Sequence, residues 1–170
     1  MDKYYYLIAQ LPLLKFREQN YLDKNSFLEE AKKWLTKEDF IKLQEADLDD
    51  LEKKGKNRFL QEYKEFELSL RKELAAYRQS KKSKQEYGPR LILEKKLLEG
   101  NPLEVENKLF FYRWQELSER SKEYVFNLEA VIAYFLKLQI LEKVLSFDKK
   151  EGTKKFDSLT EVENETNLLR

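Results

Sequence analysis

Five carboxylates fall within residues 45–52, and they form the densest group of potential metal ligands in the sequence. A calcium-binding loop of the common helix–loop–helix type needs a glycine at its turn and a bidentate glutamate at its end. This stretch has neither, so it is predicted to be an acidic linker or the first turn of a helix. The five residues are Glu45, Asp47, Asp49, Asp50 and Glu52.

Acid–base chemistry has one candidate, the pair Glu104 and Glu106 with Tyr112 nearby. Residues two apart do not share a helix face, so the two carboxylates would diverge. The chain has no His and no Cys, which excludes Ser-His-Asp and Cys-His catalysis and the usual zinc sites. The sequence therefore predicts a protein with no catalytic residues, no metal site and no cofactor.

Charge gives no general attraction to nucleic acid or to an anionic membrane. The 33 basic and 32 acidic side chains leave a net charge of +1, which is too small for a basic field. One local group, within residues 78–84, is basic. It is predicted to lie at the C-terminus of a long helix, where cations are favourable, and an acidic docking partner is the alternative. Its members are Arg78, Lys81, Lys82 and Lys84.

The composition predicts an all-α fold, a helical bundle. Only 4 Gly and 3 Pro are available for turns, while Glu, Lys and Leu, which favour helices, are abundant. Residues 57–83 form one long amphipathic helix in this prediction, because apolar residues recur three or four positions apart. The apolar stripe consists of Phe59, Tyr63, Phe66, Leu70, Leu74 and Tyr77.

Local signals place the other helices. Ser26 and Glu29 form a capping box that predicts a helix to about Leu35, and Thr36 starts a second short helix. A short helix is expected at residues 91–99. The next helix is expected to run from Pro102 to about residue 120, with an apolar stripe that starts at Leu103. Gly100, Asn101, Pro102 and Glu104 mark its start.

The last helix, residues 128–145 after the cap Asn127, is apolar around almost its whole circumference. Such a helix is buried by its neighbours or by a partner chain. Its polar exceptions, Lys137 and Gln139, would need partners in a core. We predict one helical domain over residues 1–160, with a short docking turn through Phe156 and Leu159 and a frayed tail at 161–170.

The N-terminal stretch "YYYLIAQLPLL", residues 4–14, is too short and too interrupted to cross a membrane. It also lacks the basic and apolar regions of a signal peptide. It is either a strand or a first helix, with the helix favoured, and a docked N-terminus is expected. No later segment reaches 18 apolar residues, so the sequence predicts a soluble, cytoplasmic protein.

Four residues are candidates for contact with another protein: Tyr5, Arg113, Trp114 and Lys137. Arg and Trp dominate the energetics of many interfaces. The alternative for the adjacent pair is a surface Arg113 beside a core Trp114.

Four segments carry a resemblance to a bacterial family of uncharacterised proteins encoded in V-type ATPase operons. They are "YYYLIAQLPLL", "SFLEEAKKWLTKEDF", "GNPLEVENKLFFYRWQELSE" and "FNLEAVIAYFLKLQILEKVLSFDKKEG". That family is in turn similar to the C subunit of V/A-type ATPases, called d in eukaryotes, an all-helical protein that caps the rotor. The cap protein is longer, so the resemblance implies a reduced cap, part of a longer cap, or an accessory factor.

The resemblance implies stalk or ring subunits of a V-type ATPase as partners and a position peripheral to the membrane through that complex. A second hypothesis remains open: a helical adaptor unrelated to ATPases that forms a homodimer through the apolar helix at residues 128–145.

Overall fold

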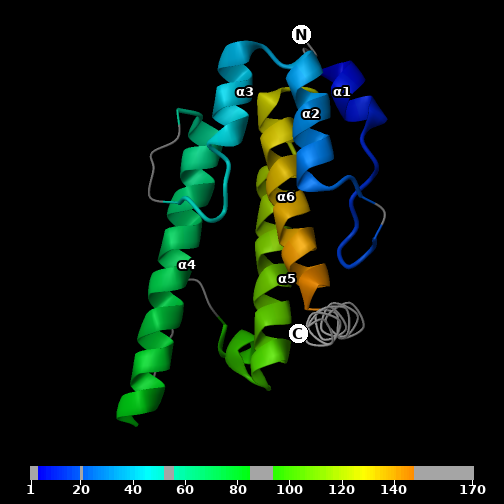
Figure 1. The fold of residues 1–170 in the computed structure, drawn as a ribbon. Helices are drawn as coiled ribbons and strands as arrows, with labels where there is room; N and C mark the ends of the chain where they lie inside the picture. Colours follow the sequence, from blue (N-terminus) through cyan, green and yellow to red (C-terminus); the bar gives the residue numbers. More distant parts are fainter. Residues whose placement is uncertain (1–3, 20, 52–55, 85–93, 148–170) are drawn as a thin grey trace, which may run out of the picture.

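The computed structural model describes residues 4–19, 21–51, 56–84 and 94–147. In these ranges the chain forms six α-helices and one short 3₁₀ segment, with no strand (Figure 1). The all-α prediction is therefore confirmed. In chain order the elements are α1 (Tyr5–Gln10), α2 (Lys24–Trp34), α3 (Lys37–Gln44), α4 (Arg58–Ser83), η1 (Lys95–Leu98), α5 (Pro102–Arg120) and α6 (Leu128–Ser146).

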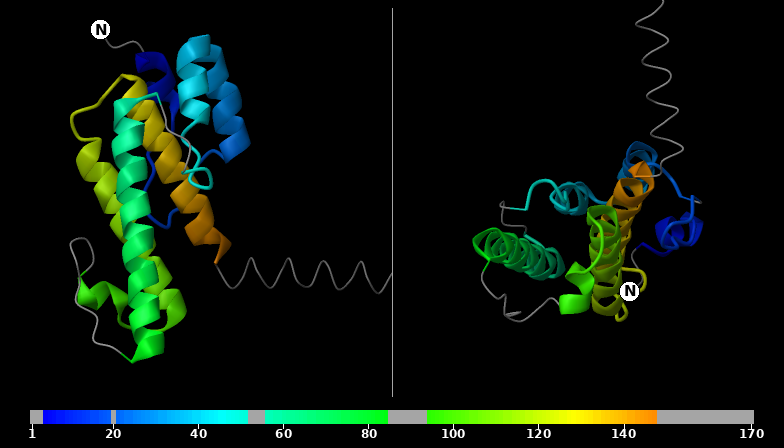
Figure 2. Two further views of the ribbon diagram at one scale, coloured as in Figure 1. Left: turned by 90° about the vertical axis from the view of Figure 1, so that its left-hand side faces the viewer. Right: turned by 90° about the horizontal axis from the view of Figure 1, so that it is seen from below.

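Helix α6 is the centre of the bundle. Helix α5 runs antiparallel beside it, and α2, α3 and α4 contact its other sides (Figures 1 and 2). Its buried residues point in all directions around the helix axis, as the sequence predicts. They are Leu128, Val131, Ile132, Ala133, Phe135, Leu136, Leu138, Gln139, Ile140, Leu141 and Val144.

Gln139 is the polar residue inside this core, only 4% exposed. Its Nε2 donates to the Ala46 carbonyl at 2.7 Å, and its Oε1 accepts from the Leu48 amide at 3.0 Å. One side chain thus satisfies two backbone groups of the segment that follows α3. The expected need for a partner is met, and the segment is fixed against α6.

The long helix α4 forms where residues 57–83 predict it. Asn57 is its N-cap and accepts from the Leu60 amide at 3.1 Å. Five residues of the predicted stripe are buried and the sixth, Tyr77, is partly buried. The stripe turns toward the other helices, and α4 lies along one side of the α5–α6 pair (Figure 2).

Two predicted boundaries differ in the structure. Helix α2 starts at Lys24, because Asp23 caps it by accepting from the amides of Asn25 and Ser26. The predicted capping box of Ser26 and Glu29 is therefore wrong, since Ser26 already lies inside the helix. The helix expected at 91–99 is reduced to η1, and residues 91–93 lie outside the described ranges.

The start of α5 is as predicted. Asn101 and Glu104 form a complete capping box, with Pro102 as the first helical residue. The preceding Gly100 has φ +125°, a conformation that other residues rarely adopt. These signals are local in the sequence, which is why the start of α5 could be predicted from it.

The acidic segment pairs with lysines. Asp47 contacts Lys24 at 3.1 Å and Asp49 contacts Lys143 at 2.6 Å, so two carboxylates tie the segment to α2 and α6. Within the part of the chain that the structure describes, no group of three or more acidic side chains could hold a metal ion.

The N-terminal stretch is a short helix followed by extended chain. Tyr4 and Leu7 are buried, the Tyr4 amide donates to Phe126 O at 3.0 Å, and Tyr134 Oη donates to Pro12 O at 3.0 Å. The predicted docked N-terminus is confirmed. At the other end, the predicted docking turn at 153–160 and tail at 161–170 lie outside the described residues.

None of the helices in the described ranges combines the length and the apolar character that a membrane crossing requires. The longest of them, α4, carries charged residues along its outer side, and the most apolar, α6, is surrounded by other helices of the chain.

Replacing Gln139 by Leu should lower the free energy of unfolding, because it leaves the Leu48 N–H and the Ala46 C=O without their partner inside the core. Each unsatisfied buried group costs about 1–3 kcal/mol. Urea unfolding followed by circular dichroism measures the change. The matched control is Gln79→Leu on exposed α4 surface, expected within about 0.5 kcal/mol of wild type. Equal stability of the two variants would contradict this role of Gln139.

Candidate protein-interaction surface

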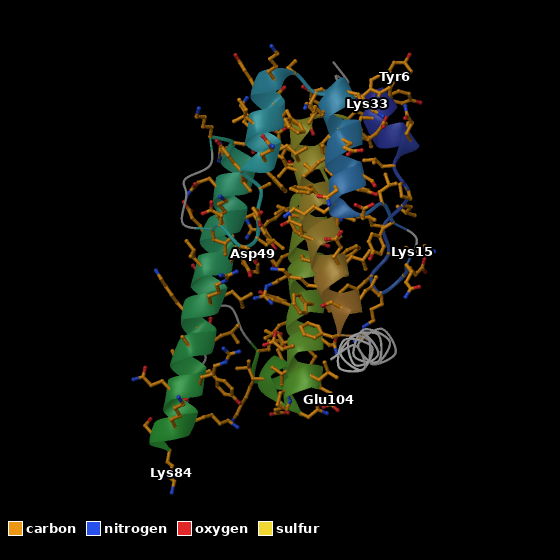
Figure 3. All side chains as sticks on the ribbon, viewed as in Figure 1. Tyr6, Lys15, Lys33, Asp49, Lys84 and Glu104 are labelled. Atoms are coloured by element: carbon orange, nitrogen blue, oxygen red, sulfur yellow. The ribbon has the colours of Figure 1, made fainter. Side chains whose placement is uncertain are left out.

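Three aromatic side chains lie exposed together at one end of the bundle, and we call them the aromatic surface: Tyr5, Tyr6 and Trp34. They are 48%, 67% and 42% exposed. Tyr6 stacks on Trp34 with ring centroids 5.9 Å apart, and Tyr5 meets Tyr6 edge-on at 5.6 Å. Figure 3 shows Tyr6 at the end of the molecule, close to Lys33 of α2.

Contacts with the rest of the bundle fix the position of the aromatic surface. Tyr4 and Leu7 fix α1 in the core, so the residues between them must face outward. Tyr5 packs edge-on against Phe126 at 4.8 Å, and Trp34 Nε1 donates to Glu30 at 3.0 Å. These contacts hold large apolar rings in one arrangement before any partner binds.

Charged side chains border the aromatic surface. Glu30 accepts from Lys33 at 2.6 Å as well as from Trp34, and these two hydrogen bonds, with Lys33 the larger influence, hold the pKa of its carboxyl below the usual value. An apolar centre with a charged rim is the usual anatomy of a protein interface.

Of the four residues predicted for an interface, Tyr5 lies in the aromatic surface. Arg113 does not, because its side chain is only 11% exposed and faces α4. Its Nε donates to both carboxylate oxygens of Glu67, at 2.7 and 2.9 Å, and Glu67 is 3% exposed. The observed partner of Arg113 is thus internal, and a contact with another protein stays a prediction.

The Glu67–Arg113 pair joins α4 to α5 in partly apolar surroundings. Arg113 Cζ lies 5.5 Å from the centre of the Phe110 ring. The nearby Tyr63 hydroxyl is buried and makes no hydrogen bond with any described group. Burial, and secondly the charge of Glu67, raise the pKa of Tyr63. A buried charge in this setting depends strongly on its partner.

Trp114 and Lys137, the other two predicted residues, lie together at the contact between α5 and α6. The Lys137 Nζ is 5.5 Å from the Trp114 ring centroid, and Phe16 packs edge-on against Trp114 at 5.7 Å. Both side chains are partly buried. Among the described residues no carboxylate pairs with Lys137, and burial lowers the pKa of its ammonium group.

Tyr6 and Trp34 are the residues of the surface that the sequence analysis did not identify. The sequence could have identified Tyr6 as outward-facing, because it lies off the helical stripe of Tyr4, Ile8 and Leu11. A large aromatic residue on the outward side of a short helix is a candidate for a contact. Trp34 had no such signal, since its stacking on Tyr6 depends on how α1 and α2 pack.

Comparison with known proteins gives one partial match. A family model described as "Protein of unknown function (DUF2764)" matches residues 86–165. No curated protein matches the chain, and neither does any solved structure. The matched region contains Arg113, Trp114 and Lys137, whereas the aromatic surface lies outside it. The comparison therefore assigns no activity to either part.

Arg113→Leu and Glu67→Leu should each destabilise the protein, by up to about 3–5 kcal/mol, because each removes the nearest partner of a buried charge. Glu67 keeps only the more distant Arg71, at 3.8 Å, when Arg113 is replaced. The double variant should be more stable than either single variant, since it removes both charges. Urea unfolding of all four proteins measures this coupling.

The matched control for this cycle is Arg78→Leu. Arg78 also joins α4 to α5, through Glu106 at 3.4 Å, but its side chain is 68% exposed. Its loss should change stability by less than about 1 kcal/mol. Additive effects at Glu67 and Arg113 would contradict the coupling.

Lys137→Met should stabilise the protein at pH 7, because burial disfavours the ammonium form of Lys137. Its folded pKa lies below the unfolded value of 10.5, so the unfolded chain binds more protons between these two values. The free energy of unfolding of the wild type should therefore increase as the pH rises from the folded pKa of Lys137 toward 10.5. The advantage of Lys137→Met should shrink over the same interval.

Urea midpoints of the wild type and Lys137→Met across the alkaline range measure this difference. Lys72→Met, at an exposed position of α4, serves as the control and should show no such trend. A Lys137→Met variant less stable than wild type at pH 7 would mean that the contact with Trp114 outweighs the cost of burial.

Proposed function

We propose that this protein is a non-catalytic structural or assembly subunit of a V-type ATPase, and that it binds the complex through the aromatic surface. The observation that carries the binding role is the exposed stack of Tyr5, Tyr6 and Trp34 at one end of a helical body. The identity of the complex rests on the resemblance of four segments to proteins encoded beside V-type ATPase subunits.

The physical argument for a binding surface is the exposure of rings that already have a fixed arrangement. Exposed Tyr and Trp bury large area with little loss of side-chain freedom, so they are frequent anchors at interfaces. Tyr6 alone is 67% exposed although it stacks on a neighbour. A partner that covers the stack would remove this apolar area from water.

A role as a cap on the rotor, like that of the longer cap protein of V/A-type ATPases, is the finer form of this proposal. It implies stalk or ring subunits as partners and a cytoplasmic position at the membrane through the complex. A non-catalytic role is supported by the absence of His and Cys from the sequence and by the structural use of the acidic residues, such as Glu104 in its capping box.

The alternative, a self-associating adaptor, rests on the apolar circumference of residues 128–145. In the structure α2, α3, α4 and α5 of the same chain contact α6, so the helix needs no second copy to bury it. A homodimer would have to use another surface, and α6 no longer supports it.

Affinity purification from native cells, with a tag at the C-terminus and mass spectrometry of the eluate, tests the proposal. Wild type should recover V-type ATPase stalk or ring subunits. The double variant Tyr6→Ser with Trp34→Ser should recover about tenfold less, because loss of an anchor residue commonly costs more than about 1.4 kcal/mol of binding free energy.

Ile41→Ser is the matched control, since Ile41 is 52% exposed on α3 and lies outside the aromatic surface. It should recover the ATPase subunits as wild type does. Recovery of the protein alone, or as a dimer without ATPase subunits, would contradict the association. Undiminished recovery by the double variant would contradict the role of the aromatic surface only.

A further inference from the structure

A second apolar region lies far from the aromatic surface, along the contact between α5 and the end of α6. Two adjoining hollows of about 310 and 440 Å³ share Arg17 and Asn107 in their walls. We call them together the α5–α6 groove. Its apolar walls come from Phe16, Leu103, Phe111 and Phe147.

Large apolar side chains remain uncovered in the α5–α6 groove. Leu103, Phe111 and Phe147 are 51%, 44% and 49% exposed, although the sequence predicts Leu103 on the buried stripe of its helix. Farther along α5, Phe16 covers the helix by packing on Phe111 and Trp114. The groove begins where this cover by the N-terminal segment ends. Figure 3 shows Glu104 at this end of α5.

Arg17 supplies a positive charge at the α5–α6 groove. Its backbone adopts φ +68°, which a non-glycine residue rarely takes, and its guanidinium lies 5.8 Å from the Phe16 ring centre. None of the carboxylates in the described ranges forms an ion pair with it. A guanidinium group with unused donors beside an apolar hollow suits a segment that combines apolar and acidic side chains.

We propose that the α5–α6 groove binds residues 153–160 of the same chain, with Phe156 and Leu159 in the hollows and an acidic neighbour, Asp157 or Glu161, paired with Arg17. This proposal does not depend on the ATPase association. It would extend the packed domain beyond α6 and cover the exposed apolar residues of the groove.

Chain length permits this docking. Phe147 is itself part of the groove wall and is the last described residue before the segment. Phe156 follows it nine positions later in the sequence, and an extended chain of that length spans about 30 Å. The segment therefore starts at the groove and has ample length to turn back into it.

Charge and similarity favour this occupant over an unrelated partner. The segment and the groove wall both carry charges of both signs. Asp157 and the adjoining Glu161 can pair with Arg17. Lys154 and Lys155 of the same segment can face Glu104 of the groove wall or water. The family model matches through residue 165, so the similarity that includes α5 and α6 continues through the proposed segment. A tail that packs on these helices would be part of the same unit.

Thiol cross-linking of the full chain tests the proposal, because the natural sequence has no Cys. Asn107→Cys in the groove is combined with Ser158→Cys and treated with a short bismaleimide. The control pair is Lys72→Cys with Ser158→Cys, since Lys72 lies on exposed α4. Docking should make the first pair cross-link within one chain at least about tenfold faster, because it raises the effective concentration.

Charge reversal adds specificity to the test. Arg17→Glu should slow the cross-linking of the first pair toward the control rate. Adding Asp157→Lys with Glu161→Lys should restore it, which a merely misfolded variant would not allow. Equal rates for the two pairs, or cross-links at the mass of two chains only, would overturn the proposal, the second result indicating a tail from another copy.

Discussion

The burial of α6 on all sides is the constraint on which the rest of the structure depends. A helix with apolar residues around its circumference is stable in water only when neighbours cover every side. Here α5 covers one side, and α2, α3 and α4 contribute the others. The polar Gln139 is tolerated in this core because its amide forms hydrogen bonds with backbone groups of the segment after α3. The core thus determines where that segment lies, and with it the start of α4.

Helix α4 is attached differently from the other helices around α6. Its apolar stripe reaches the core, but its contact with α5 includes the buried Glu67–Arg113 pair. Buried pairs contribute little net stability compared with apolar residues, and they penalise arrangements that separate the charges. The pair therefore favours one position of α4 along α5.

Several of the exposed large apolar side chains gather at two places, the aromatic surface and the α5–α6 groove. They differ in the support they receive. The rings of Tyr5, Tyr6 and Trp34 pack on one another and stay outward, which suits a partner from outside. The groove includes Phe147, the residue that follows α6, and Arg17, which forms no ion pair with a described carboxylate; both suit a segment of the chain itself. We therefore assign the two surfaces different roles: the aromatic surface binds another protein, and the α5–α6 groove binds a segment of the same chain.

The sequence by itself determined the helical class and the helix starts at Asn57, Asn101 and Asn127, because capping and periodicity are local. It also determined that residues 128–145 must be buried. Tertiary structure alone decided which residues cover them, so the choice between neighbours and a second copy required the packed chain. The same holds for the internal partner of Arg113, for the contact between Trp114 and Lys137, and for the stacking of Tyr6 on Trp34. Each joins residues from different helices, and no local spacing encodes how two helices pack.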